Sequence, residues 1–203
     1  MQQEKRIYCV EGVHDWGNDR IEPTVEPMLA LLQKTGYWPY QHRTCATIAE
    51  LKWRLQTEWW DWCKKGSVLY FSMHGYHDQI WLRPDADDAE VVGVLTLKEW
   101  LDCTGCHVHF GGCDTFSGGK ENLRNFMEST GAVSVSGYAT EADWLSPVAP
   151  ALALELLLFG LLHDVNLAHN AKSRPGKLRK IEQEVNSRFG DCEFRMLIRG
   201  QEP

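Results

Sequence analysis

The feature that most constrains the fold is a nearly continuous apolar run, Ser67–Met73 (SVLYFSM), which ends at His74-Gly75. A strand that is apolar on both faces is typical of the middle of a parallel sheet covered by helices on both sides. Strand-like and helix-like segments alternate along the rest of the chain, which is the pattern of an open α/β fold. Right-handed crossovers bring the ends of parallel strands to one edge of the sheet, so we expect functional residues at that edge.

Six segments have the residue pattern of strands, and we predict that most of them run parallel in one sheet with helices on both faces. The predicted strands are residues 6–13, 38–45, 67–73, 106–110, 132–138 and 193–198. The third strand is expected at the centre, and the polar second strand and the sixth strand are expected at the edges. A hairpin-like insertion is expected between the third and fourth strands. Because edge strands tend to pair, the last strand could also join a second copy of the chain in a homodimer.

Length and composition favour one domain, residues 1–203, with 43% hydrophobic residues and a net charge of −7. The chain lacks the basic footprint of a nucleic-acid-binding protein. Its longest apolar segment, Val148–Leu162, is interrupted by Glu155 and is shorter than the roughly 20 residues of a membrane span, so we interpret it as a buried helix. No signal peptide is recognisable. We therefore predict a cytoplasmic protein that binds neither nucleic acid nor membrane and uses no cofactor.

The seven cysteines do not follow the spacing of a secreted disulfide scaffold, so we expect reduced thiols. Four of them have apolar neighbours in the sequence and are expected to be small core residues, namely Cys9, Cys45, Cys63 and Cys192.

Two reactive residues follow neighbouring predicted strands, His74 after residues 67–73 and Cys113 after residues 106–110 and two glycines. Paired strands lie about 4.8 Å apart, so the imidazole and the thiol are expected within or close to hydrogen-bond reach. A thiol becomes a strong nucleophile when an imidazole takes its proton. The positive N-terminal end of a helix that follows Cys113 would further stabilise the thiolate and lower the pKa of the thiol. The two glycines would let the backbone approach a substrate. The N–H groups of Gly75 and Cys113 are candidates for an oxyanion hole.

The two motifs, LYFSMHGYHD and HVHFGGCDTF, resemble those of the caspase-like cysteine peptidases of clan CD. This clan includes caspases, metacaspases, separases, gingipains, legumains and the bacterial CHAT domains, and the second motif is most similar to the CHAT and separase form. The resemblance covers residues 6–162 in the order of elements. It implies a caspase-like fold and a cysteine endopeptidase with His74 as general base and Cys113 as nucleophile. The chain departs from the family pattern at Gly112, where Ala is usual, and at Phe116, where CHAT proteins often have Gly.

The resemblance also implies a pocket for the substrate side chain. In several clan members an acidic residue after the next strand binds a basic side chain before the scissile bond. Here Ala139–Trp144 (ATEADW) follows the fifth predicted strand, so Asp143, or Glu141 as second choice, would hold an Arg or Lys side chain. An ordinary acidic loop explains these letters equally well. The expected partner is a protein or peptide cleaved after a basic residue.

Two other interpretations stay open. Cys103 and Cys106, with His107 and His109, have ligand chemistry suited to zinc, although a second ligand pair is missing and the two histidines alternate onto the opposite strand face from Cys106. The chain could also be a non-catalytic signalling or scaffold module that retains His74 and Cys113.

Overall fold

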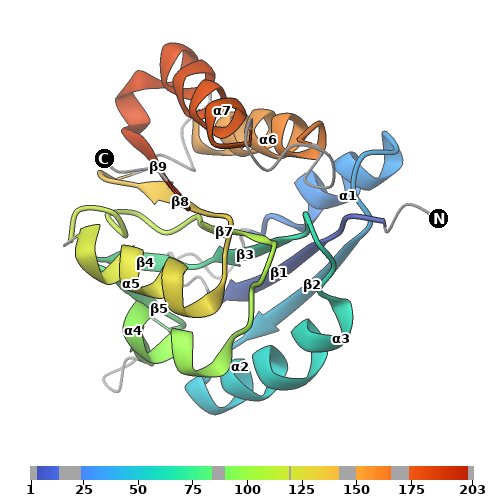
Figure 1. The fold of residues 1–203 in the computed structure, drawn as a ribbon. Coiled ribbons are helices and arrows are strands. Elements are labelled where there is room, and N and C mark those ends of the chain that lie inside the picture. The colour runs from blue at the N-terminus through green and yellow to red at the C-terminus, as the bar shows by residue number, and fades with distance from the viewer. Residues whose placement is uncertain are drawn as a thin grey trace.

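The computed structural model describes residues 4–13, 24–83, 90–118, 120–141, 150–165 and 174–200. It confirms the predicted α/β class. A six-stranded, mostly parallel sheet has helices on both faces, and a small three-stranded sheet lies beside it (Figure 1).

The large sheet has the strand order β2-β1-β3-β7-β8-β9. Its strands are β1 (Ile7–Gly12), β2 (Tyr40–Cys45), β3 (Val68–Ser72), β7 (His107–Phe110), β8 (Ser134–Tyr138) and β9 (Phe194–Ile198). The first five run parallel, and β9 is antiparallel to β8. All six predicted strands are confirmed, with the third inside the sheet and the second and sixth at its edges. The alternation of apolar segments was therefore sufficient to locate the strands and to identify the two edges of this sheet.

Helices cover the two faces of the sheet in two groups (Figure 1). One face carries α1 (Glu26–Lys34), α6 (Pro150–His163) and α7 (Arg174–Arg188), which is followed by the 3-10 turn η3 (Gly190–Cys192). The other face carries α2 (Ile48–Arg54), the π-helical segment η1 (Leu55–Trp59), α3 (Trp60–Trp62), α4 (Val94–Leu97), the 3-10 turn η2 (Lys98–Trp100) and α5 (Lys120–Thr130). The long apolar segment forms α6, as expected. No helix in the ranges that the structure describes is both long and apolar enough to cross a membrane.

The predicted insertion is a three-stranded antiparallel sheet with strands β4 (His74–Tyr76), β5 (Gln79–Trp81) and β6 (Val91–Gly93). The sequence indicated the second and third of these strands but not the first. His74 therefore begins a new strand, separated from the end of β3 by Met73 alone, and is not part of an open loop. Its pairing opposite Trp81 anchors the segment that carries the imidazole.

Strand β9 lies at the sheet edge, but α7 covers part of that edge. Glu182 accepts a hydrogen bond from the Met196 N–H (2.9 Å), and Asn186 donates one to the Phe194 carbonyl (2.9 Å). These two side chains occupy backbone groups that a further strand would need. Pairing with a second copy stays a prediction, and it would require these side chains to move away.

Candidate functional site

The ends of β3 and β7 bring the segments of His74 and Cys113 together. In the parallel pairing of these strands Phe71 lies opposite Phe110, and the Gly111 N–H continues the ladder by donating to the Phe71 carbonyl (2.8 Å). His74 and Cys113 follow the Phe71–Phe110 pair at the same offset in sequence. The structure thus meets the condition that the predicted dyad required, because the two strands are immediate neighbours.

Beyond this register the two segments pack backbone against backbone. A Cβ atom placed on Gly112 would lie 2.6 Å from the Met73 carbonyl oxygen and 2.7 Å from the Gly75 nitrogen. A Cβ atom on Gly75 would lie 2.7 Å from the Cys113 carbonyl oxygen. All three distances to backbone atoms are too short for any side chain to fit. We expected the glycines before Cys113 to let the backbone approach a substrate. At Gly112 the absence of a side chain instead lets the backbone before Cys113 contact the backbone around His74.

The turn that follows Cys113 is held from two directions. On one side the His77 N–H donates to the Asp114 carbonyl (3.2 Å). On the other side the Asp114 N–H donates to the Thr140 carbonyl (3.1 Å), and the Phe116 N–H donates to the Tyr138 carbonyl (2.8 Å). Cys113 is therefore fixed between the small sheet and the end of β8.

Backbone strain is concentrated around this turn. Asp114 has a φ of 54°, and His77 and Asp78 have φ values of 44° and 59°, all in the left-handed region that non-glycine residues seldom adopt. Such strain clusters at functional sites, where the surrounding structure has to maintain it. The segment directly after Cys113 is a turn, and the helix expected after Cys113 is α5, which begins at Lys120. A favourable field from this helix at the thiol stays a prediction.

His74 and Cys113 are both half-buried, and Cys113 packs against the core cluster on the α6 face of the sheet. Cys113 therefore packs against the core and still retains some solvent exposure. That is the kind of surrounding in which a nucleophilic cysteine works, whereas a fully buried cysteine is inert.

A buried carboxylate lies beneath the segment that leads to Cys113. Glu155 of α6 has no exposed surface and accepts hydrogen bonds from the hydroxyl groups of Tyr70 and Tyr138 and from Nε2 of His109 (3.0 Å). Burial and the charge of Glu155 raise the pKa of both tyrosines well above the ordinary value, so both remain protonated donors. A Cβ atom on Gly111 would lie 3.0 Å from the Glu155 carboxylate, which places the network directly under the strand end.

Sequence reasoning treated Glu155 only as an interruption of an apolar helix. A single charged residue within an otherwise apolar segment is in fact a signal of a buried, paired charge. The partners come from three different strands, far from Glu155 and from one another in sequence, so their identity required the structure.

The two predicted substrate-binding residues have different outcomes. Glu141 is exposed and directly follows Thr140, whose carbonyl binds the turn after Cys113, so Glu141 lies next to the site segment. Asp143 lies outside the described residues. The pocket for a basic side chain at Asp143 stays a prediction.

The zinc interpretation loses its geometric basis. Cys106 belongs to the core cluster on the α2 and α5 face, whereas His109 binds Ser136 and Glu155 beneath α6. The predicted alternation of these side chains onto opposite faces is confirmed. Within the described part of the chain there is no cluster of three or more His, Cys, Asp or Glu side chains that could hold a metal ion.

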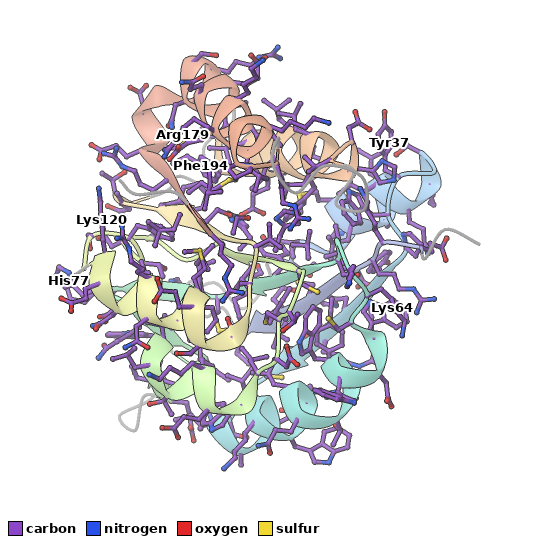
Figure 2. The ribbon with its side chains drawn as sticks, viewed as in Figure 1. Tyr37, Lys64, His77, Lys120, Arg179 and Phe194 are labelled. Atoms are coloured by element: carbon purple, nitrogen blue, oxygen red, sulfur yellow. The ribbon has the colours of Figure 1, made fainter. Side chains whose placement is uncertain are left out.

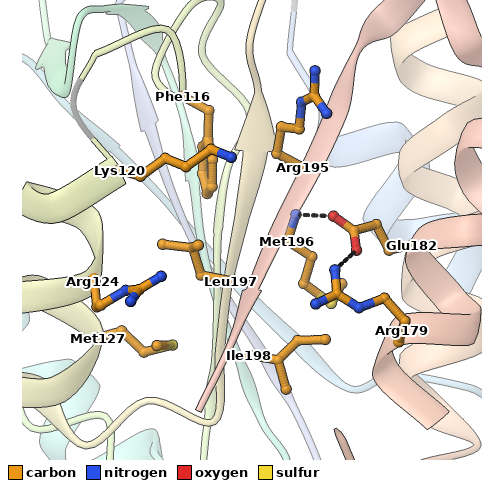
Figure 3. Close-up of a pocket in the computed structure, with 10 residues that line it drawn as sticks. All are labelled: Phe116, Lys120, Arg124, Met127, Arg179, Glu182, Arg195, Met196, Leu197 and Ile198. Atoms are coloured by element: carbon orange, nitrogen blue, oxygen red, sulfur yellow. Dashed lines mark hydrogen bonds and ion pairs between the residues drawn. The ribbon is translucent and has the colours of Figure 1, made fainter. Parts of the chain in front are cut away.

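A hollow of about 170 Å³ lies between α5, β9 and α7, and Phe116 from the turn after Cys113 is part of its wall (Figure 3). Four of its side chains are cationic, and its one carboxylate, Glu182, already accepts hydrogen bonds from Arg179 (2.6 Å) and from a backbone N–H of β9. The cationic side chains are Lys120, Arg124, Arg179 and Arg195. This hollow would repel a basic side chain, so it is not the predicted pocket for Arg or Lys.

The fold and these contacts define a class: an α/β protein in which a histidine and a cysteine stand on touching backbone segments at the ends of two central strands. The chain belongs to the DUF6642 family, a family of unknown function whose model matches residues 4–171. A search of curated proteins found no match. Among solved structures the chain is similar to Raptor from Chaetomium thermophilum, with 13% sequence identity and a TM-score of 0.49. That match covers 79% of this chain, and the chain spans 18% of the length of Raptor.

Proposed function

We propose that this chain is a cysteine endopeptidase of the caspase-like class, with Cys113 as nucleophile and His74 as general base. The observation that carries the proposal is the contact between the Gly112–Cys113 and Met73–Gly75 backbones. It supports a dyad because both residues follow a pair of neighbouring strands at equal offset, and the glycines leave no side chain between the two segments.

In the proposed reaction His74 accepts the proton of the Cys113 thiol, and the thiolate attacks the carbonyl carbon of the scissile peptide bond. The N–H groups of Gly75 and Cys113 are the proposed donors to the oxyanion that develops on the carbonyl oxygen. His74 then protonates the leaving amine, and an acyl-enzyme forms on the sulfur. Water, activated by His74, releases the acyl group and restores the thiol.

The surroundings of the dyad support preorganisation. Catalytic groups need to be held close to their productive geometry by neighbours that are themselves fixed. The left-handed turn at Asp114 is hydrogen-bonded to Thr140 on one side and to His77 on the other. The fully buried Glu155 network stiffens the sheet beneath Gly111.

We propose that the substrate has Arg or Lys immediately before the scissile bond. Glu141 adjoins the turn after Cys113, and Asp143 follows it by two positions, so either carboxylate could form a charge-assisted hydrogen bond with a basic side chain. The net charge of −7 would also favour the approach of basic substrates at low ionic strength.

A positional-scanning peptide library tests the proposal on wild type and on Cys113→Ala. We expect cleavage after Arg or Lys by the wild type and at least a roughly thousandfold lower rate in the variant, because the members of a dyad act as a unit. Cys192→Ala removes a buried thiol elsewhere and should retain activity. Circular dichroism establishes that each variant is folded. Full activity in Cys113→Ala would refute the dyad, whereas preference for Asp or a bulky apolar residue would refute only the pocket.

A further inference from the structure

A second pair of thiols lies at the opposite end of β3 and β7 from the proposed dyad. The Sγ atoms of Cys63 and Cys106 are 2.8 Å apart. Cys63 follows α3 and is half-buried, whereas Cys106 precedes β7 and is fully buried. Cys63 packs against the core cluster of the α2 and α5 face, as expected, but it is only half-buried and its sulfur faces another thiol. Lys64, its sequence neighbour, and His77, which binds the turn after Cys113, lie on opposite sides of the molecule (Figure 2).

The backbone around the two thiols holds them in register. The Gly66 N–H donates to the Gly105 carbonyl (2.8 Å), and the His107 N–H donates to the Ser67 carbonyl (2.9 Å). These two hydrogen bonds join the chain segments that carry the cysteines, at positions between the two sulfurs and the first residues of β3 and β7. A disulfide bond is about 2.05 Å long, so bond formation requires the sulfurs to approach by less than about 1 Å.

The two thiols have different electrostatic surroundings. The hydrogen bond between the two sulfurs lowers the pKa of Cys63; burial and the charge of Asp102 oppose this effect, and the Lys64 charge assists it. The same hydrogen bond, together with burial, raises the pKa of Cys106 far above its ordinary value. The more exposed sulfur therefore forms a thiolate more readily, and the buried sulfur keeps its proton. This division of roles is the one found in redox-active pairs with an attacking and a resolving cysteine.

We propose that Cys63 and Cys106 form an oxidation site that hydrogen peroxide converts into an intramolecular disulfide. The Cys63 thiolate attacks one oxygen of the peroxide, the O–O bond breaks, and a sulfenic acid forms while hydroxide leaves and is protonated to water. The Cys106 sulfur then attacks the Cys63 sulfur, the S–O bond breaks, and a second water carries away the Cys106 proton. The two thiols lose two electrons, and the peroxide gains them.

The third nearby cysteine does not compete in this assignment. Cys103 is fully buried, and burial raises its pKa well above the ordinary value, so its thiol remains protonated. The spacing Cys103-Thr104-Gly105-Cys106 looks like a redox motif in the sequence, yet the sulfur that approaches Cys106 belongs to Cys63.

Oxidation of the full chain carrying Cys113→Ala tests the proposal independently of the peptidase activity. The protein is treated with hydrogen peroxide, the remaining thiols are alkylated, and a digest is analysed by mass spectrometry. We expect a cross-linked peptide pair containing Cys63 and Cys106, about 2 Da lighter than the two free peptides, which disappears on reduction with dithiothreitol. It should form at least about tenfold faster than any oxidation of the buried Cys9 or Cys45.

Two matched variants separate the possible pairings. Cys63→Ser should abolish the cross-link and leave Cys106 open to alkylation after denaturation, whereas Cys103→Ser should leave the cross-link intact. A cross-link between Cys103 and Cys106, or a Cys63 that stays a thiol or proceeds to sulfinic acid without cross-linking, would overturn the proposal.

Discussion

Substitution of Gly112 by alanine probes the contact on which the proposed site depends. The caspase-like motif usually has Ala at this position, so the sequence resemblance alone predicts that Gly112→Ala is harmless. The structure predicts the opposite. An added Cβ atom would lie 2.6 Å from the Met73 carbonyl oxygen, 2.7 Å from the Gly75 nitrogen and 2.9 Å from the Gly75 Cα, where ordinary contacts are 3.4 Å or longer. All three atoms belong to backbone, which cannot rotate away as a side chain would.

The expected magnitude follows from these distances. Overpacking of this kind costs about 1–3 kcal/mol of unfolding free energy, and the lost freedom of the unfolded glycine returns about 0.4–1 kcal/mol. The net destabilisation is at most about 2.6 kcal/mol, with a central value of about 1.3 kcal/mol, and that central value lowers Tm by about 3–5 °C for a chain of this size. Relief of the clash also separates Cys113 from the His74 segment, and a shift of about 1 Å can reduce catalysis about a hundredfold.

Thermal unfolding followed by circular dichroism and the alkylation rate of Cys113 measure both effects. Gly93→Ala is the matched control, because Gly93 has φ −76° and ψ 150° and an added Cβ atom there meets nothing within 4 Å. A Gly112→Ala protein with the Tm of Gly93→Ala and with wild-type Cys113 reactivity would refute the argument.

Two further perturbations address buried charge. Glu155→Leu leaves the Tyr70 and Tyr138 hydroxyls buried without their acceptor, so we expect urea denaturation to show a loss of at least about 3 kcal/mol, and an unchanged midpoint would contradict this role. For His107, burial, assisted by neighbouring cations, lowers the pKa in the folded protein to about 3, while the unfolded chain titrates near 6.5. The unfolded state therefore takes up this proton first as pH falls, and the stability present above pH 6.5 is lost progressively toward pH 3. Between pH 6.5 and 5 the wild type should lose about 2 kcal/mol more than His107→Gln, measured by urea denaturation at both pH values; parallel pH profiles would exclude the effect.

The sequence was sufficient for the features that depend on local patterns. Ser67–Met73 is apolar on both faces, which identified a central parallel strand, and the polar second strand identified an edge. The pairing of the two strands that His74 and Cys113 follow was expected, because strands that succeed one another along the chain are usually neighbours in the sheet.

The remaining features depend on contacts between residues distant in sequence. The partners of Glu155 come from β3, β7 and β8, and no periodicity links them. The cationic hollow joins α5 with the last helix and strand, and Cys63 meets Cys106 across 43 positions. Strand β4 could not be predicted because a three-residue segment is too short to show a strand-like alternation of residues. It is a strand because it pairs with β5.

The alkylation rate of Cys113 in wild type and in His74→Gln tests the proposed dyad most directly. Both proteins are treated with iodoacetamide near pH 7, and each cysteine is followed by mass spectrometry. The account predicts that Cys113 is modified at least about tenfold more slowly in His74→Gln, because the imidazole no longer takes the thiol proton. Cys63, which is also half-buried but lies at the other end of β3, is the internal reference and should react at the same rate in both proteins. Equal rates at Cys113 in the two proteins would contradict the central claim.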